Sequence, residues 1–260
     1  MRPGLTIAII SFNEEDMIGD CILSADFADQ IIVVDSGSSD NTQIIARSLN
    51  AEVYIYDEWE GFATQRNRAL LHCKHEYIFF LDCDERITSG LAKEIREATT
   101  ANNANYGFIR WENYVFGKKL RGIHETKGIP RFFKRNDIDQ FSGIVHEKAS
   151  LKEGIHSKQY FFKSKLIHHS RRSIYQSLLK LAQYTRLSSV RLRDKNRKGG
   201  MLTGMAHAIP RFVNMYVFKL TFLSGQEGFL YCFFVSLETL LKYCAVAYDS
   251  AEKSIQLPKR

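Results

Sequence analysis

The sequence predicts an α/β protein in which a mostly parallel sheet is flanked by helices and followed by a helical C-terminal extension. Short β-branched or aromatic runs alternate with helix-like stretches through the first half of the chain, which is the rhythm of a parallel sheet. Most residues of these runs are apolar, as is typical of strands buried on both faces. After Ser170 the pattern becomes helical.

The expected elements follow from this rhythm. Four strands are predicted in the first half, at Leu5–Ile10, Ile31–Val34, Glu52–Tyr56 and Tyr77–Leu81. Each precedes a predicted helix, at Glu14–Ala25, Asn41–Leu49, Phe62–His72 and Ser89–Thr99. Shorter strands are expected at Tyr106–Trp111, Pro130–Lys134 and Tyr160–Ile167, and three helical blocks near Ser173–Arg193, Met205–Leu223 and Gly228–Tyr248. We therefore expect a domain over residues 1–170 and a helical, basic and amphipathic region over residues 171–260.

Composition excludes several classes of protein. Hydrophobic residues make up 45% of the 260 residues, which is enough for a sizeable core and excludes a disordered chain. The five cysteines are scattered without a CxxC pair, which argues against a disulfide framework or a zinc site and indicates a reducing compartment. A strand-like run begins at Leu5 without the pattern of a signal peptide. We expect a cytoplasmic protein, free or attached to the cytosolic side of a membrane.

Basic residues concentrate late in the chain. The net charge is +7, and residues 171–198 hold nine Lys and Arg but one acid, Asp194. Such a patch fits anionic lipid, nucleic acid or an acidic substrate, and a solvated helix face is the alternative. The longest uncharged stretch of the last helix, Gly228–Leu237, is shorter than the roughly 20 residues of a membrane span. We expect surface-lying membrane attachment, or else burial of these helices on each other or on a partner subunit.

Polar, largely acidic loops follow three of the predicted strands. They are Ser11–Glu15, Asp35–Asp40 and Asp82–Glu85. In parallel sheets, ligands bind where the carboxyl ends of strands meet, so we expect one site there. Mg²⁺ takes one or two carboxylates while phosphate and water oxygens complete its shell, and Asp82 and Asp84 offer that set. The bound cation would offset phosphate charge and make a nucleoside diphosphate a better leaving group; a solvent-exposed turn is the alternative.

Four motifs identify a family. "AIISFNEED", "IIVVDSGSSDNT", "ATQRNRAL" and "EYIFFLDCDERI" resemble, in this order, the N-terminal half of family 2 glycosyltransferases, which have the GT-A fold, a Rossmann-like sheet flanked by helices. Within that family, residues 4–150 are similar to the bacterial lipopolysaccharide-core β-1,4-glucosyltransferases. The resemblance implies an inverting, metal-dependent transfer of a hexose from a nucleotide-sugar, with UDP-glucose expected, to an inner-core sugar. Another lipid-linked, capsular or protein acceptor is the alternative.

The resemblance also implies roles for matching residues. Asp35 would bind the donor base, Ser11 and Glu14 would line the nucleoside pocket, Asp40 would hold its loop or reach the nucleotide, and Arg66 and Asn67 would face the nucleotide. Asp82 would contact ribose or the metal and its water, Cys83 would lend backbone, and Asp84 would ligate Mg²⁺ or Mn²⁺. Each residue also has a plain structural interpretation; Asp40, for example, would cap the helix that starts at Asn41.

The general base is less directly indicated. The family usually takes it from a Glu-Asp pair, and the one such pair here, Glu15-Asp16, belongs to the first helix. "FSGIVHEKA" resembles the core-glycosyltransferase subgroup, and makes Glu147 the candidate base and His146 its orienting or phosphate-binding neighbour, or the base itself. Arg131 would contact the diphosphate or an acidic acceptor.

Other classes fit less well. A dinucleotide oxidoreductase needs G-x-G-x-x-G after its first strand, where this chain has Ser-Phe-Asn-Glu-Glu. A nucleotidyltransferase would need a Gly-rich basic loop there. Nucleic-acid binding would explain the basic helix, but three acidic loops would repel a phosphate backbone. The expected partners are therefore the nucleotide-sugar donor, a lipid A–core acceptor and the cytosolic face of the inner membrane.

Overall fold

The computed structural model describes residues 2–122, 128–143 and 148–249. Its contacts divide the chain into two compact units. Among the described residues, the first unit holds 2–112, 128–143 and 148–168, and the second holds 113–122 and 169–249. Both units are discontinuous in sequence, whereas the domains predicted above are continuous.

The first unit is built on parallel strands. Strands β1 (Leu5–Ser11), β2 (Gln30–Asp35), β3 (Glu52–Ile55) and β4 (Tyr77–Asp82) lie in the order β3-β2-β1-β4. Their register places Ser11 opposite Asp35 and Ile10 opposite Asp82. The carboxyl ends of the three central strands therefore reach the same edge, as the sequence predicts.

Antiparallel strands extend the sheet beyond β4. The order continues β8 (Ile129–Lys134), β6 (Tyr106–Val115), β11 (Gln159–Arg171) and β5 (Glu85–Arg86), with β7 (Lys118–Lys119) paired to β6. A 3-10 turn, Arg135–Asp137, leads into a separate two-stranded sheet of β9 (Ile138–Ser142) and β10 (Lys148–Leu151). Strands β5, β7, β9 and β10 were not predicted.

Helices cover both faces of the parallel strands. They are α1 (Glu15–Leu23), α2 (Thr42–Ser48), α3 (Phe62–His72) and α4 (Ser89–Ala101). Leu5, Ile7 and Ile9 of β1 belong to a core formed with α1, α2 and α4, whereas the alternate residue Ala8 packs in a core with α3. Successive side chains of a strand point to opposite faces, so a strand covered on both sides is mostly apolar. The predicted fold class is confirmed.

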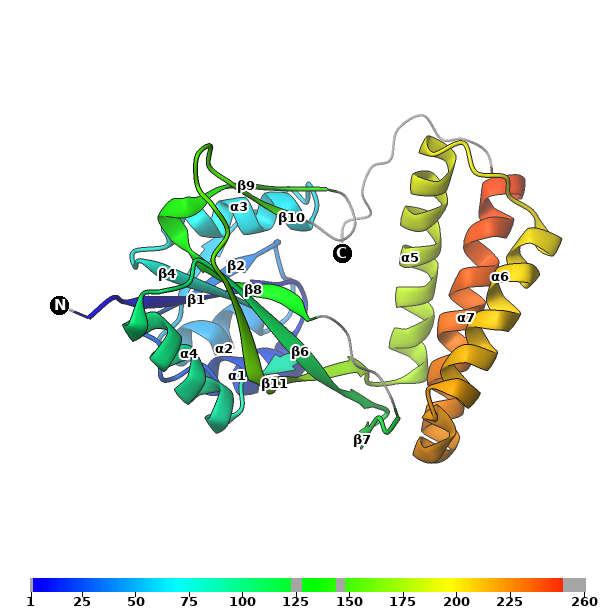
Figure 1. Ribbon diagram of the computed structural model, residues 1–260, viewed down its shortest axis with the longest axis horizontal. Helices are drawn as coiled ribbons and strands as arrows, with labels where there is room; N and C mark the ends of the chain where they lie inside the picture. The colour runs from blue at the N-terminus through cyan, green and yellow to red at the C-terminus, as the bar shows by residue number, and fades with distance from the viewer. Residues whose placement is uncertain (1, 123–127, 144–147, 250–260) are drawn as a thin grey trace. The chain divides into compact units, whose positions relative to one another are not determined.

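The second unit contains the C-terminal helices. These are α5 (Ile174–Asp194), α6 (Met201–Val213) and α7 (Gly225–Tyr248), with a π-helical turn at Asn214–Phe218 and a 3-10 turn at Thr221–Ser224. Helix α7 packs against both α5 and α6 (Figure 1). Gly204 permits the α6–α7 approach, because a Cβ there would lie 2.8 Å from the Leu240 backbone oxygen.

Two predictions about these helices need correction. A single helical block was predicted over Met205–Leu223. The helix observed there, α6, begins earlier and ends at Val213, and the two turns follow it, separated by Leu220 in a left-handed conformation. Residues Thr221–Tyr248 also form one helical segment that is long and apolar enough to cross a membrane by length and composition, with a mean hydropathy of 1.5 and 28% of that window buried. The sequence analysis counted uncharged residues and so did not expect this.

Candidate active site

The end of β2 holds a buried carboxylate that organises the loop after it. Asp35 is fully buried, and its Oδ2 accepts hydrogen bonds from Ser11 Oγ at 2.7 Å and Ser38 Oγ at 2.6 Å. Its Oδ1 accepts from the Ser38 amide at 2.8 Å and from Gln43 Nε2 at 2.7 Å. The structure therefore brings Ser11 and Asp35 together as predicted. Contact between Asp35 and a nucleotide base stays a prediction.

The loop after β1 is tied to the loop after β2. Asp40 accepts hydrogen bonds from the Thr42 amide and hydroxyl and, at 3.1 Å, from the amide of Glu15. The amide of Glu14 donates to Thr42 Oγ1 at 2.8 Å. Burial raises the pKa of Asp40, but these hydrogen bonds outweigh it and hold the pKa below its ordinary value. Asp40 thus holds two loops at the starts of α1 and α2, one of the roles predicted for it.

A buried arginine lies at the centre of the site. Arg131 of β8 is 4% exposed and reaches two carboxylates: its Nη2 lies 2.5 Å from Asp82 Oδ2 and 2.7 Å from Glu85 Oε1. Burial lowers the pKa of Arg131, but the two carboxylates outweigh this and raise it. For Asp82 the effect of burial has the opposite sign and raises the pKa. The charges of Arg131 and Arg66 more than offset it, so the pKa of Asp82 is lowered. Arg131 therefore keeps Asp82 ionised and oriented.

Glu85 is the second acid of this network, and the sequence analysis gave it no role. It is fully buried; Oε2 accepts from the Asp82 amide at 2.9 Å and Oε1 from Trp111 Nε1 at 2.7 Å. Burial is the largest cause of its raised pKa, and Arg131 opposes that rise. A buried carboxylate needs such a partner, because an isolated buried charge is strongly unfavourable. Trp111 had no local signal in the sequence, since it lies on another strand, β6.

Asp84 lies beside a histidine. Its Oδ2 is 3.7 Å from His168 Nε2, and the His168 ring stacks on Trp111 with centroids 4.6 Å apart. Asp82 and Asp84 are thus both at the end of β4, as predicted. Cys83 between them is buried; its thiol donates to the Ile10 carbonyl at 3.2 Å, and burial raises its pKa. The Cys83 side chain is therefore a packing group.

The two site residues predicted on α3, Arg66 and Asn67, both contact neighbouring strands. Arg66 is buried, lies over the Phe80 ring at 4.9 Å, and reaches Asp82 Oδ1 at 3.4 Å. Asn67 pairs with the backbone of Phe141 through two hydrogen bonds, of 2.9 and 2.7 Å. Arg66 therefore joins the acidic cluster, whereas Asn67 holds β9 in place.

The predicted base cannot be placed in the same way. Glu147 and His146 lie outside the described residues. Within the described ranges, no group of three or more His, Cys, Asp or Glu side chains is arranged to hold a metal ion. Two carboxylates at the end of β4 still match the protein share of a Mg²⁺ or Mn²⁺ shell completed by phosphate oxygens. Asp84 fits that role better, because the oxygens of Asp82 face Arg131 and Arg66.

Known proteins share the sequence that builds this site. Residues 6–151 match the family described as Glycosyl transferase family 2. The lipopolysaccharide core biosynthesis glycosyltransferase LpsC of Rhizobium meliloti is 34% identical over 161 residues, which is 56% of this chain and 60% of LpsC, so less than two thirds of that relative is spanned. A protein of Rickettsia bellii, described as an uncharacterized glycosyltransferase, is 27% identical over 85% of this chain and 79% of its own length.

Solved structures give more distant matches. Glucosyl-3-phosphoglycerate synthase from Mycobacterium tuberculosis, crystallised with Mn²⁺, UDP and glucosyl-3-phosphoglycerate, has a TM-score of 0.39 and 19% identity over 51% of this chain and 57% of that one. TarS of S. aureus, residues 1–349, has a TM-score of 0.45 and 16% identity over 64% of this chain and 60% of that one.

Proposed function

The chain belongs to glycosyltransferase family 2, and from that premise we propose that it moves a hexose from a nucleotide-sugar, UDP-glucose in the first instance, to an inner-core sugar of lipopolysaccharide with inversion at the transferred carbon. The observation that carries the proposal is the position of Asp82 and Asp84 at the end of β4, next to the polar ends of β1 and β2. In an open parallel sheet this edge binds ligands.

The donor is proposed to lie across the ends of β1, β2 and β4. The loops after β1 and β2 offer Ser11, Glu14, Asp35 and Asp40 to the nucleoside, while Asp84, with Asp82, is proposed to hold Mg²⁺ or Mn²⁺. The cation would neutralise charge on the departing diphosphate. Arg131 is buried against Asp82 and Glu85, which supports a role in orienting Asp82 rather than in touching the acceptor.

The acceptor hydroxyl needs a general base. We propose Glu147 for this, with His146 as its orienting neighbour or its substitute; the proposal rests on the resemblance of "GIVHEKA" to the core glycosyltransferases. The likeness to LpsC supports a lipopolysaccharide-core acceptor. Such an acceptor is anchored in lipid, and it accords with a peripheral position of the enzyme on the cytosolic face of the inner membrane.

Ligand-dependent stability and sugar transfer test the proposal together. The full-length chain is heated with UDP-glucose, UDP-galactose, UDP-N-acetylglucosamine or a guanosine diphosphate sugar, each with and without Mn²⁺, because a bound ligand raises the unfolding temperature. The expected result is stabilisation by a uridine donor only with the metal, and transfer from that donor to lipopolysaccharide truncated at the inner core. Metal-independent stabilisation would contradict the role of Asp84, and transfer only to a capsular, other lipid-linked or protein acceptor would contradict the proposed acceptor.

A further inference from the structure

The outward side of α6 is apolar, which is the reverse of an ordinary surface helix. Gly204 and Ala208 are buried, and Gly204 approaches Leu240 of α7. At 3.6 residues per turn, Leu202, Ile209 and Val213 lie on the opposite side of the helix, and all three are exposed. Leu202 is 84% exposed.

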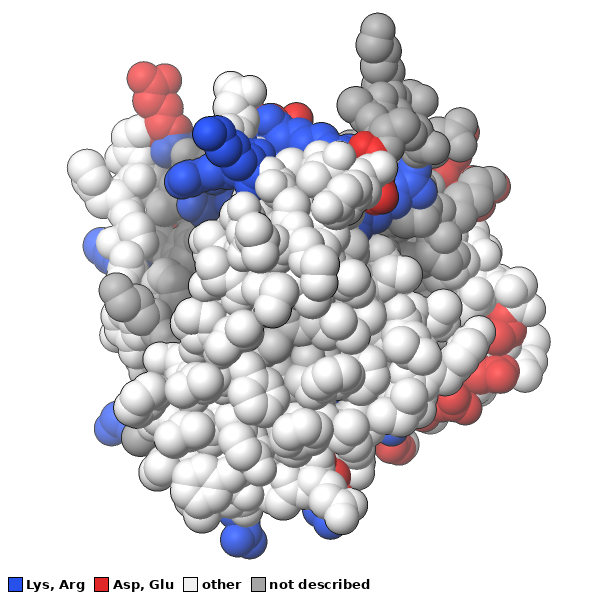
Figure 2. All heavy atoms as spheres, turned by 90° about the vertical axis from the view of Figure 1, so that its right-hand side faces the viewer, with Lys and Arg blue, Asp and Glu red and all other residues white. Residues whose placement is uncertain are grey.

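The turns after α6 continue this exposed apolar surface. Phe218 is 70% exposed, and Val217 and Leu223 are about half exposed. We call Leu202, Ile209, Val213, Val217, Phe218 and Leu223 the apolar face. In Figure 2, which looks onto the side where α6 is drawn in Figure 1, a broad area without charged side chains is bordered above by lysines and arginines.

The segment of chain that carries most of the apolar face is basic. From residue 195 to residue 226 the sequence contains no Asp or Glu, but it contains five basic residues. Lys195, Arg197 and Lys198 are exposed in the segment before α6, and Lys219 is exposed between the two turns after it. Arg193 serves another purpose, because its guanidinium donates to the Ala245 and Asp249 carbonyls at the end of α7. Cations at both ends of an apolar surface match the headgroups of an anionic bilayer.

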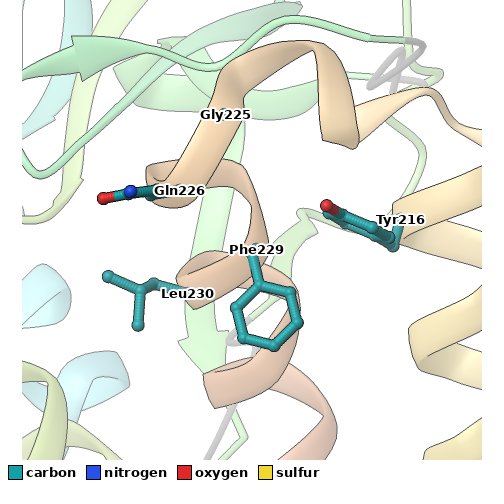
Figure 3. A pocket seen from close by; sticks show the side chains of 5 residues that line it. All are labelled: Tyr216, Gly225, Gln226, Phe229 and Leu230. Atoms are coloured by element: carbon teal, nitrogen blue, oxygen red, sulfur yellow. The ribbon is translucent and has the colours of Figure 1, made fainter.

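A hollow of about 530 Å³ lies in the same unit, and its lining includes Tyr216, which precedes Val217 in the chain. It is lined by Tyr216 of the π-helical turn and by Gly225, Gln226, Phe229 and Leu230 of α7 (Figure 3). The two aromatic rings and the leucine make its lining mainly apolar. An apolar lining of this kind is compatible with contact to an acyl chain.

We propose that the apolar face lies in the boundary between headgroups and acyl chains of an anionic phospholipid bilayer. The inference deepens the proposed function, because it names the surface that would bring the enzyme to a lipid-anchored acceptor. Helix α6 is too short to span a bilayer, which needs about 20 residues. Helix α7 is long enough, but it packs against both α5 and α6, and the proposal is that the unit lies on the membrane and does not cross it.

Vesicle co-sedimentation of the full-length chain tests the proposal. We expect binding to phosphatidylcholine vesicles that contain phosphatidylglycerol, and weak binding to phosphatidylcholine alone. Leu202→Gln with Phe218→Gln should lower the affinity at least about tenfold, since two exposed apolar side chains would no longer be buried in lipid. Arg197→Gln with Lys198→Gln should remove most of the preference for anionic vesicles.

A matched control uses equally exposed leucines of the first unit. Leu23→Gln with Leu71→Gln, at positions 57% and 73% exposed, should leave vesicle binding unchanged. Wild-type vesicle binding by the Leu202/Phe218 variant would overturn the proposal. So would retention of the protein in membranes after an alkaline carbonate wash, which would show that α7 crosses, or a concentration-dependent dimer that this variant abolishes without any lipid binding.

Transfer to a water-soluble core oligosaccharide separates this inference from the proposed function. The Leu202/Phe218 variant should keep that activity while losing activity on vesicle-held acceptor. If the wild type transfers no sugar but binds anionic vesicles, the proposed function fails and the membrane surface stands. If the wild type transfers sugar but does not bind vesicles, the membrane surface is ruled out and the proposed function stands.

Discussion

At the scale of single residues, the site depends on the positive charge of Arg131, a side chain too deeply buried to contact a ligand. Arg131 holds Asp82 from one side and meets the buried Glu85 on the other. Trp111 donates to Glu85 as well, so the acid's position is fixed by three elements of the sheet. The consequence is that Asp82 faces the ligand edge in one orientation before any ligand binds.

Removal of Arg131 should therefore harm stability and activity for separable reasons. Arg131→Met leaves Glu85 buried without its cation, and we expect a loss of about 3–5 kcal/mol in the free energy of unfolding. Glu85→Gln combined with Arg131→Met removes both charges and should restore most of that stability. Turnover should stay low in the double variant, because Asp82 has lost its orienting partner. Urea denaturation and transfer kinetics measure the two effects; equal stability of both variants would contradict this account.

Asp84 is expected to act on the ligand and not on the fold. Asp84→Asn keeps the shape of the side chain but loses the charge proposed to hold the cation, so turnover should fall about a hundredfold or more, the scale of losing one charge-stabilising group. Stabilisation by UDP should no longer depend on Mn²⁺. Asp26→Asn, at an exposed acid remote from β4 in sequence, is the control and should behave as wild type. Wild-type turnover in Asp84→Asn would remove the metal role.

Glu147→Gln tests the proposed base. Loss of a general base typically costs about 10²–10⁴ in rate, and we expect this loss in turnover with little change in donor affinity. Steady-state kinetics with UDP-glucose, together with direct UDP binding, distinguish the two. If His146→Gln shows the large turnover loss and Glu147→Gln does not, the base is the histidine.

At the scale of elements, Asp40 joins the starts of α1 and α2, and its pKa is lowered, so this link should depend on pH. A carboxylate with a lowered pKa stabilises the folded state above the unfolded value, near pH 4, and loses that contribution as pH falls through the folded value. Asp40→Asn should cost about 1 kcal/mol at pH 7, a modest value because solvent screens a partly exposed group.

The dependence of stability on pH tests this prediction. Urea midpoints of wild type and Asp40→Asn should differ most at pH 5 and above, and should converge as the pH falls below about 4 and through the lowered pKa of Asp40. Asp26→Asn, at an exposed acid, is again the control and should match the wild-type midpoint at pH 7. A difference between wild type and Asp40→Asn that is the same at pH 3 and pH 7 would show that the link does not depend on the charge.

The sequence predicted elements with strong local patterns and missed those defined by pairing. Strands β1, β2 and β4 are apolar runs, and α3 has the bounds expected for it, Phe62–His72. Strands β5 and β7 have two residues each and exist only through their partners, so no local pattern marks them. The same holds for the site: Asp82 and Asp84 follow a strand and were predicted, whereas Glu85 and Trp111 gain their role from contacts between β4, β5, β6 and β8.

At the scale of the whole molecule, each compact unit has buried residues of its own. The first has the two cores around β1, and the buried residues of the second include Leu181, Cys232 and Phe234. Domains with separate cores often unfold in separate transitions. We therefore expect calorimetry of the full chain to show two transitions.

Two perturbations should assign these transitions. Gly204→Leu adds a side chain at a position where even a Cβ would lie 2.8 Å from Leu240. This substitution should lower the transition temperature of the second unit. UDP with Mn²⁺ at about 100 times its dissociation constant adds about 2.7 kcal/mol to the unit that binds it, a rise of roughly 5–10 °C for a unit of this size. Because the proposed donor site consists of residues of the first unit, only the transition insensitive to Gly204→Leu should rise, and Asp84→Asn should abolish that rise. A rise confined to the transition that Gly204→Leu lowers would place the nucleotide in the helical unit and contradict the site at the end of β4.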